Sequence, residues 1–295
     1  MKDGDLQPGQ IVNAMSVDVE DWFQVGAFEK TIARDDWDTY ALRVSDNVAR
    51  ILALFDRHQV TATFFTLGWI AERVPRTIRA IVEAGHELAS HGYDHTRVFT
   101  YTPDQFREDL RKSRAILEDA AGTAVTGYRA PSFSIDPRCS WAHSILAEEG
   151  YAYSSSVAPI RHDHYGWRDA PRFAFQPVEG SDLMEIPVTT VSVGARRMAA
   201  GGGGFFRVLP YGFTRWAIER VNSEEGRPAI FYFHPWEMDP DQPRVESAPL
   251  RSRLRHYTNL SRMEDKLERL SQRFSWSRMD AVAAQEAKRC LPFPV

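Results

Sequence analysis

Cysteines are scarce in this chain, and long hydrophobic runs are absent. Only Cys139 and Cys290 occur in 295 residues, which is too few for a disulfide framework, and their surroundings do not resemble a thiolate metal site. No segment approaches the roughly 18 consecutive apolar residues that a membrane-spanning helix needs, and residues 1–15 have neither the basic nor the apolar region of a secretion signal. The sequence therefore predicts a cytoplasmic protein with no membrane span, whose chemistry relies on oxygen and nitrogen ligands.

The chain also lacks an excess of basic charge. Its 36 Lys and Arg residues face 40 Asp and Glu residues, which gives a formal net charge of −4. This balance supplies no field for holding a polyphosphate backbone, so nucleic acid is excluded as the main partner. Because 43% of the residues are hydrophobic, the chain can bury enough apolar surface for one large domain or two small ones.

Short apolar runs alternate with stretches of helical periodicity. Residues 11–17 and 61–65 have the composition of strands, and residues 44–55 between them place apolar side chains at helical spacing. The rhythm continues, and we predict later strands at residues 87–90, 124–128, 151–154, 183–191 and 229–233. This alternation is typical of an α/β fold. It does not distinguish an open doubly wound sheet from a closed barrel.

Polar residues follow four of these predicted strands at the point where each strand ends. They are Asp18, His91, Arg129 and His234. Because the carboxyl ends of parallel strands meet at the same edge of a sheet or barrel, we expect these side chains to lie close together. Beyond them, residues 235–249 are rich in proline and charge, and an amphipathic helix follows over 260–274. We predict a single domain over residues 1–295, with residues 235–280 as a lid or extension on it.

Two motifs have the composition of a metal site. His91 and His95 follow a strand in the string HGYDH, and on a helical turn or tight loop this spacing lets both rings reach one ion at about 2.0–2.1 Å. Asp18, Glu20 and Asp21 crowd the end of the first strand, and a cation relieves their mutual repulsion. Ordinary loop histidines and a solvated turn with a helix cap are the alternatives. Together the motifs supply the three protein ligands of a catalytic zinc site.

Glu20 and Asp21 compete for the position of the third ligand. If the strand stays extended beyond Asp18, side chains alternate, so Glu20 points to the same side as Asp18 and Asp21 points away. If the chain turns sharply after Asp18, Asp21 can swing inward instead. We expect Glu20 to be the ligand and keep Asp21 as the alternative.

Several other residues are candidates for roles in catalysis. His234 ends an apolar strand, and histidine is the side chain best suited to protonate a leaving group near neutral pH, although a lone histidine beside a buried strand is commonly structural. Arg129 can hold a carboxylate in a bidentate pair or be a surface arginine. Trp22 and Trp236 lie near the predicted site loops, where their rings can stack on a sugar. The glycine run 201–204 lacks the context of a phosphate loop and indicates a backbone in close approach.

In this order, the motifs resemble those of the polysaccharide deacetylases of the NodB-homology type, a group of metal-dependent carbohydrate esterases like those of family four. SVDVEDWF is similar to the first motif, whose leading Asp is the catalytic base. The resemblance gives this role to Asp18 and a metal-ligand role to Glu20, with Asp21 still open. SHGYDH resembles the second motif and implies that His91 and His95 are metal ligands.

The remaining motifs resemble the family with two departures. Gly92 stands where the second motif usually has Ser or Thr. RAPSFS is similar to the third motif, which implies that Arg129 holds the base and that the backbone amide of Ser132 is a candidate donor to the oxyanion. FHP matches the last motif and gives His234 the role of general acid. Many members carry an acidic residue after the fifth strand that tunes this histidine, but residues 151–156 read YAYSSS, so the group that tunes it is left open.

Further strings extend the resemblance over nearly the whole chain. DVEDWF, IRHDHYG, GGGGFFR, HPWEMDPDQPR and HYTNL resemble more narrowly the exosortase-associated deacetylases encoded with bacterial exopolysaccharide genes. The implied fold is an α/β distorted (β/α) barrel with seven strands and a C-terminal extension. The implied activity is metal-dependent removal of acetyl groups, most often N-acetyl, from an exopolysaccharide or its precursor. The implied cofactor is a divalent ion, zinc first, with cobalt or another divalent ion as the alternative.

Two other functions compete with this interpretation. One is an amidohydrolase with the same metal site that acts on a small cyclic or linear amide, for which we expect a closed pocket instead of an open groove. The other is a catalytically silent glycan-binding protein, for which we expect the base or the acid to be lost. Both Asp18 and His234 are present, which favours an enzyme acting on an acetylated glycan.

Overall fold

The computed structural model describes residues 11–160, 166–194 and 196–293. His162 and His164, which belong to the IRHDHYG string, lie outside these residues. Within them, no helix is long and apolar enough to cross a membrane.

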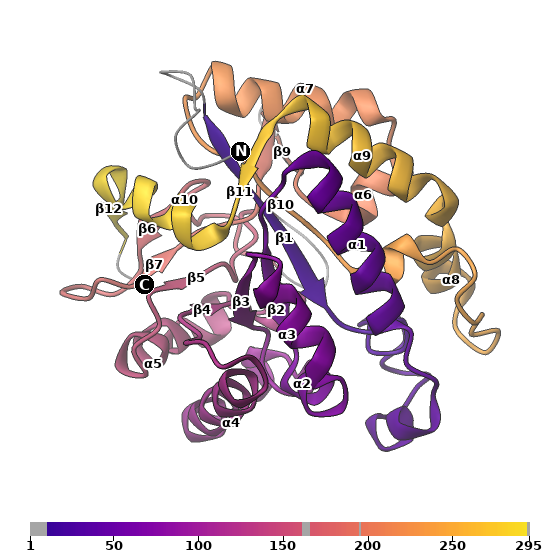
Figure 1. Cartoon of the computed structure of the whole chain (residues 1–295). Coiled ribbons are helices and arrows are strands. Elements are labelled where there is room, and N and C mark those ends of the chain that lie inside the picture. Colours follow the sequence, from indigo (N-terminus) through magenta and orange to yellow (C-terminus); the bar gives the residue numbers. More distant parts are fainter. Residues whose placement is uncertain (1–10, 161–165, 195, 294–295) are drawn as a thin grey trace.

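Parallel strands form the centre of the main sheet (Figure 1). Each is hydrogen-bonded to the next in the spatial order β10 (Ile230–Phe233), β1 (Val12–Val19), β2 (Thr63–Thr66), β3 (Glu87–Ser90), β4 (Gly127–Tyr128), β5 (Tyr153–Ser154) and β7 (Met184–Glu185). The sheet is extended by β6 (Phe175–Gln176), antiparallel to β7, by β12 (Leu291–Pro292) beside β6, and by β11 (Ser275–Ser277) beside β1.

The sheet curls so that irregular segments cover the outer edge of β10. Thr189 N donates to Ile230 O at 3.3 Å, and Tyr232 N donates to Gly201 O at 2.7 Å. Thr189 and Gly201 both follow β7 in the chain, so these bonds take the place of continuous strand pairing between β7 and β10. The predicted α/β architecture with a distorted barrel is confirmed.

One predicted strand is wrong in its extent. The structure divides residues 183–191 between β7 and β8 (Thr190–Val193), and β8 pairs with β9 (Arg196–Ala199) in a separate antiparallel sheet. Pro187 lies between the two strands. Because proline has no N–H to donate to a ladder, it ends the strand that the apolar run alone predicts.

Helices connect the strands and cover the sheet (Figure 1). The α-helices are α1 (Val44–His58), α2 (Gly68–Arg73), α3 (Pro75–Glu83), α4 (Pro103–Ala121), α5 (Trp141–Glu148), α6 (Gly203–Val208), α7 (Tyr211–Ser223), α8 (Leu250–Tyr257), α9 (Met263–Arg273) and α10 (Met279–Glu286). Short 3₁₀ turns are η1 (Arg34–Thr39), η2 (Val98–Thr100), η3 (Pro131–Phe133), η4 (Pro137–Cys139), η5 (Pro235–Met238), η6 (Leu260–Arg262) and η7 (Ala287–Arg289).

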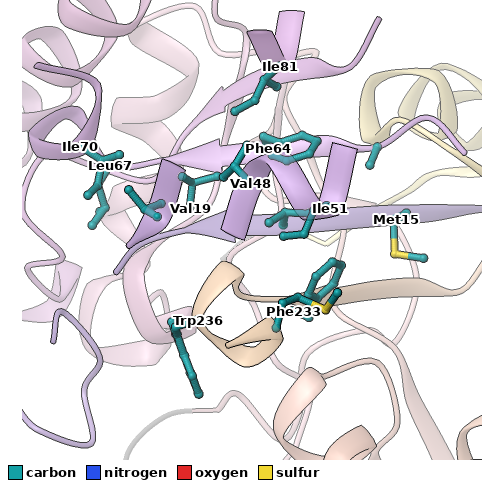
Figure 2. Packing of buried hydrophobic residues seen from close by; sticks show 14 of the residues in the cluster. Met15, Val19, Val48, Ile51, Phe64, Leu67, Ile70, Ile81, Phe233 and Trp236 are labelled. Atoms are coloured by element: carbon teal, nitrogen blue, oxygen red, sulfur yellow. The ribbon is translucent and has the colours of Figure 1, made fainter. Parts of the chain in front are cut away.

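The largest core lies between α1 and the strands β10, β1 and β2. Val48 and Ile51 of α1 are fully buried, and Figure 2 shows them beside Phe64 of β2 and Phe233 of β10. Each such side chain contributes about 1.5–3 kcal/mol to folding when it is buried. Because this packing fixes β10 next to β1, the residues that follow the two strands end at the same edge of the sheet.

Part of the predicted extension packs into this core instead of lying over the sheet as a lid. Met263, Leu267 and Leu270 of α9 are fully buried in the same cluster as α1. Figure 1 shows α9 alongside α1, and β11, which follows α9, pairs with β1. This part of residues 235–280 therefore forms the wall of the barrel.

Candidate active site

The predicted site residues gather at the carboxyl edge of the parallel strands. Asp18 is the second-last residue of β1, and His91 directly follows β3. Arg129 directly follows β4, and His234 directly follows β10. The parallel order of these strands brings side chains together that are far apart in the sequence, as the strand-end pattern predicts.

Glu20, His91 and His95 form a group that is able to hold a metal ion. Each offers one ligand atom, these atoms all lie within 4.8 Å of one another, and all three residues are buried. His95 Nε2 lies 2.8 Å from Glu20 Oε2, yet this oxygen has no hydrogen-bond partner among the described residues. A buried carboxylate oxygen without a donor, facing two imidazoles, fits a divalent cation that prefers nitrogen and oxygen ligands.

Hydrogen bonds orient two of these ligands. His91 Nδ1 donates to the carbonyl oxygen of Arg129 at 2.8 Å, and this fixes the tautomer in which Nε2 keeps its lone pair for a metal. Trp236 Nε1 donates to Glu20 Oε1 at 3.1 Å, which leaves Oε2 of the same carboxylate toward His95. Both contacts are of the kind that orients ligands around an ion.

The protonation states of the group suit metal binding at neutral pH. Burial alone raises the pKa of Glu20, but the neighbouring His95 and His234 lower it to about 2. Burial lowers the pKa of His91 to about 4. Glu20 is therefore anionic and His91 neutral at pH 7, and these are the forms that coordinate a cation.

The loop that carries the two histidines explains the glycine at position 92. Gly92 has φ +74°, and a Cβ there would lie 3.0 Å from Asp109 Oδ2 of α4. Asp109 Oδ1 accepts a hydrogen bond from Tyr93 N at 3.2 Å. The space that a Ser or Thr side chain would need is thus taken by Asp109. His95 also has a positive φ, +61°, a strained conformation that persists where the surroundings hold it.

Asp21 does not join the metal group. Its Oδ2 accepts hydrogen bonds from Arg43 N at 2.7 Å and Val44 N at 2.9 Å, and its Oδ1 accepts one from Trp22 N at 2.8 Å. The two bonds to Oδ2 satisfy N–H groups at the start of α1, which have no partner within the helix. The structure therefore gives Asp21 the helix-cap role, and of the two alternatives only Glu20 lies with the histidines.

Asp18 and Arg129 form a buried ion pair beside this group. Asp18 is 2% exposed and Arg129 is fully buried. Arg129 Nη1 donates to Asp18 Oδ1 at 2.6 Å and to Ser16 Oγ at 2.8 Å, and its Nε and Nη2 donate to the carbonyl and hydroxyl oxygens of Ser155. Because the guanidinium is held on several sides, it fixes the position of one carboxylate oxygen of Asp18.

His234 has an acidic partner three residues later in the chain. His234 Nδ1 lies 2.8 Å from Glu237 Oε1, and its Nε2 lies 3.6 Å from Glu20 Oε1. Burial lowers the pKa of His234, but the charges of Glu20 and Glu237 outweigh it and raise the pKa to about 9. Glu237 itself bonds to Arg207 Nε at 2.5 Å. Glu237, on the turn after β10, is thus the carboxylate that contacts Nδ1 of this histidine, whereas residues 151–156 contain no acidic side chain.

Sequence reasoning missed Glu237 and Arg207. The available signal for Glu237 was its spacing from His234, since residues three apart at the start of a turn face each other. No local signal identifies Arg207, which is 30 residues from its partner and is fully buried among polar groups.

The structure does not support stacking of Trp22 or Trp236 on a sugar. Trp22 is 4% exposed, and its ring packs edge-on against Phe23 and Tyr40. Trp236 is 7% exposed and lies between the rings of His234 and His256, at centroid distances of 5.2 and 4.1 Å. Neither ring offers a free face, because both lie within the protein.

Ser132 lies in a strained turn next to the site. Its φ is +55° and that of the following Phe133 is +50°, and two successive positive values for non-glycine residues indicate a backbone conformation that the surroundings impose. The oxyanion role of the Ser132 amide stays a prediction.

Family comparisons agree with this geometry. Residues 33–153 match the family model described as polysaccharide deacetylase. This part of the chain belongs to the polysaccharide deacetylase family. Residues 155–284 match a second model, described as a domain of unknown function, DUF3473. The deacetylase segment contains His91, His95 and Arg129, and the second segment contains His234 and its partner Glu237.

Curated proteins that are similar to part of this chain are named as deacetylases of peptidoglycan. A peptidoglycan deacetylase from Helicobacter pylori is 29% identical over 151 residues, which is 50% of this chain and 50% of that protein. A peptidoglycan-N-acetylglucosamine deacetylase from Bacillus cereus is 34% identical over 94 residues, 32% of this chain and 34% of that protein. The chain thus spans about half or less of the length of these relatives.

A solved structure shows that the deacetylase fold extends over both segments. A protein from Mycobacterium smegmatis assigned to the polysaccharide deacetylases aligns with a TM-score of 0.65 at 19% identity, over 96% of this chain and 94% of that chain. At this identity the likeness concerns the fold alone.

Proposed function

We propose that this protein is a metal-dependent deacetylase that hydrolyses an acetamide of an acetylated glycan, with a bacterial exopolysaccharide or its precursor as substrate. One observation carries the proposal: the Glu20, His91 and His95 group lies beside both the Asp18–Arg129 pair and the His234–Glu237 pair. Such a set supplies metal ligands, a base and an acid at one site.

In this proposal Glu20, His91 and His95 hold a divalent ion, for which zinc suits the donor set. Such an ion would supply Lewis-acid polarisation of the acetyl carbonyl and a pKa for the attacking water lowered toward about 7. The residues of the chain perform the proton transfers and orient the reacting groups. The exopolysaccharide substrate rests on the narrower sequence resemblance, whereas the relatives above are named for peptidoglycan.

Asp18 removes a proton from the water that attacks the carbonyl carbon. Arg129 keeps Asp18 in place through a direct hydrogen bond, so that the carboxylate is positioned to accept the proton. The amide of Ser132 is the proposed donor to the oxygen that gains negative charge. A contact of this type lowers the activation barrier by roughly 3–4 kcal/mol.

His234 completes the reaction by giving its Nε2 proton to the departing amine. The C–N bond then breaks, and acetate and a free amino sugar are released. Glu237 holds Nδ1 of His234, which directs Nε2 away from the turn and toward Glu20 and the metal group. An amine leaves poorly without this proton, so the acid is required for amide hydrolysis.

We further propose that residues 1–295 act as one catalytic unit. The base and metal ligands come from residues before position 130, and the acid comes from the segment that matches DUF3473. The presence of both Asp18–Arg129 and His234–Glu237 favours a working enzyme over a silent glycan-binding protein.

Acetate release tests this function. The protein is treated with a chelator, reloaded with Zn²⁺ or Co²⁺, and incubated with N-acetylated and with O-acetylated oligosaccharides. We expect acetate from the N-acetylated substrate only in the reloaded samples. Equal rates before and after chelation, or no acetate from any glycan while a small cyclic amide is hydrolysed, would contradict the proposal.

A further inference from the structure

The glycine run and Arg207 of the GGGGFFR string have no role in the mechanism above, yet they lie against the catalytic acid. Gly203 and Arg207 both belong to α6. Their partner is Glu237, which is fully buried and bonds to His234 through its other carboxylate oxygen. The GGGGFFR string therefore contacts the catalytic acid His234 indirectly, through the carboxylate of Glu237.

The guanidinium of Arg207 donates hydrogen bonds to Glu237 on one side and to backbone carbonyl groups on the other. It is 1% exposed, and its Nε donates to Glu237 Oε2 at 2.5 Å. Its Nη1 donates to the carbonyl oxygens of His256 at 2.9 Å and Thr258 at 2.7 Å, and its Nη2 donates to Arg255 O at 3.3 Å. A buried ion pair is tolerated only when such additional bonds satisfy it. Arg207 thus connects Glu237 to the end of α8, in the HYTNL string.

Gly203 allows the close approach between α6 and Glu237. A Cβ at this position would lie 2.3 Å from Glu237 Oε1 and 2.8 Å from its Cδ, closer than carbon atoms of side chains approach such groups. The neighbouring Gly204 differs, because a Cβ there would meet nothing within 4 Å. The run of glycines therefore contains one position that the acid requires and an adjacent one that it does not.

The carboxyl-terminal end of α6 is held by Asn259 and Lys266, which come later in the chain. Lys266 of α9 donates from Nζ to Phe206 O and Leu209 O, each at 2.8 Å. Asn259 Nδ2 donates to Arg207 O at 3.0 Å. These bonds satisfy carbonyl groups at the end of a short helix and fix α6 to the wall of the barrel.

We propose that α6 is a positioning element for the catalytic acid, in which Gly203 and Arg207 fix the carboxylate of Glu237 so that His234 keeps Nε2 aimed at the leaving nitrogen. The inference rests on the proposed deacetylase function. It gives residues 155–284, the segment without an assigned function, a specific part in the reaction. Arg207 and Gly203 act through Glu237 and touch no substrate.

Substrates with different leaving groups distinguish a positioning role of α6 from a merely structural one. An amine requires a proton from the acid to depart, whereas 4-nitrophenolate leaves without one. A misplaced His234 therefore slows hydrolysis of an amide far more than hydrolysis of 4-nitrophenyl acetate. Damage to the fold or to the metal group slows both reactions equally.

The test compares Gly203→Ala with Gly204→Ala as its matched control, using zinc-loaded full-length protein. The substrates are N-acetylchitopentaose and 4-nitrophenyl acetate. Because general-acid catalysis contributes about 10²–10⁴-fold, we expect Gly203→Ala to lose about 10- to 100-fold in kcat on the amide and less than about threefold on the ester. Arg207→Gln changes in the same direction. Gly204→Ala stays within about twofold of the parent on both substrates. Equal losses of Gly203→Ala on the two substrates, or none on either, would overturn the inference.

A second readout does not depend on turnover. The proton between His234 Nδ1 and Glu237 gives a downfield ¹H NMR signal, which is assigned by its absence in His234→Ala. We expect Gly203→Ala to lose or shift this signal and Gly204→Ala to keep it. An unchanged signal in Gly203→Ala overturns the inference even if the parent proves inactive on every amide, an outcome that by itself refutes only the proposed function.

Discussion

Replacing Asp18 with Asn removes the charge of the proposed base while keeping the size of the side chain and one oxygen acceptor. Arg129 retains its bonds to Ser16 and Ser155 in this variant, so we expect the fold to survive. Hydrogen bonds to charged groups contribute about 1.5–3 kcal/mol. We expect the free energy of unfolding to fall by about 1–3 kcal/mol, less than the roughly 3–5 kcal/mol for complete removal of one partner from a buried pair.

The expected effect of this change on catalysis is larger. Loss of a general base slows turnover by about 10²–10⁴-fold, which corresponds to about 2.7–5.4 kcal/mol in the activation barrier. The zinc content is expected to stay at the level of the parent, because Asp18 is not part of the Glu20, His91 and His95 group.

The assay measures kcat/KM for acetate release, zinc content and the unfolding midpoint on the same preparations. Glu286→Gln serves as the control, because Glu286 forms a partly buried ion pair with Arg227. It lies on α10, whose first residue, Met279, bonds to Thr63 at the amino end of β2, away from the site. The control is expected to lose stability and keep its turnover. Turnover of Asp18→Asn within about threefold of the parent would refute the assignment of the base.

Two further predictions concern Glu20, Asp21 and Glu87. Glu20→Gln is expected to weaken zinc binding by at least about tenfold, whereas Asp21→Asn keeps zinc and loses about 1 kcal/mol of stability as a helix cap; a larger loss of zinc affinity in Asp21→Asn would reverse the two roles. Burial and the nearby Asp280 raise the pKa of Glu87 from 4.5 to about 7. Its proton is lost more readily from the unfolded chain, so this group stabilises the fold fully below about pH 4.5, and that contribution is lost as pH rises to about 7. In urea unfolding at pH 5 to 8, the free energy of unfolding should decline less with pH in Glu87→Gln than in the parent. Parallel curves for the two proteins would contradict the raised pKa of Glu87.

The sequence predicts the place of the site because the position of a residue after a strand is a local property. Asp18, His91 and His234 each follow an apolar run, and the parallel order of the strands then brings them together. The alternation of side chains along an extended chain predicts that Glu20 and Asp21 point to different sides, and the structure places only Glu20 with the two histidines. Pro187 indicates the break between β7 and β8, although the apolar run around it predicts one continuous strand.

Other features depend on contacts that no local pattern encodes. The pairing of Arg207 with Glu237 joins residues 30 positions apart, and its charge balance is visible only in the folded chain. Trp22 and Trp236 stand next to site residues in the sequence, but proximity along the chain does not decide whether a ring faces the site or the core. The cap formed by Asp21 likewise depends on where α1 begins, 23 residues later.

The metal content of the protein shows whether Glu20, His91 and His95 hold an ion. Purified parent, His91→Ala and His58→Ala are stripped with a chelator, dialysed against limiting Zn²⁺ and analysed for bound metal per chain; His58 pairs with Glu268, outside the proposed site. We expect one ion per chain in the parent and in His58→Ala, and far less in His91→Ala. Equal loading of all three proteins would contradict it.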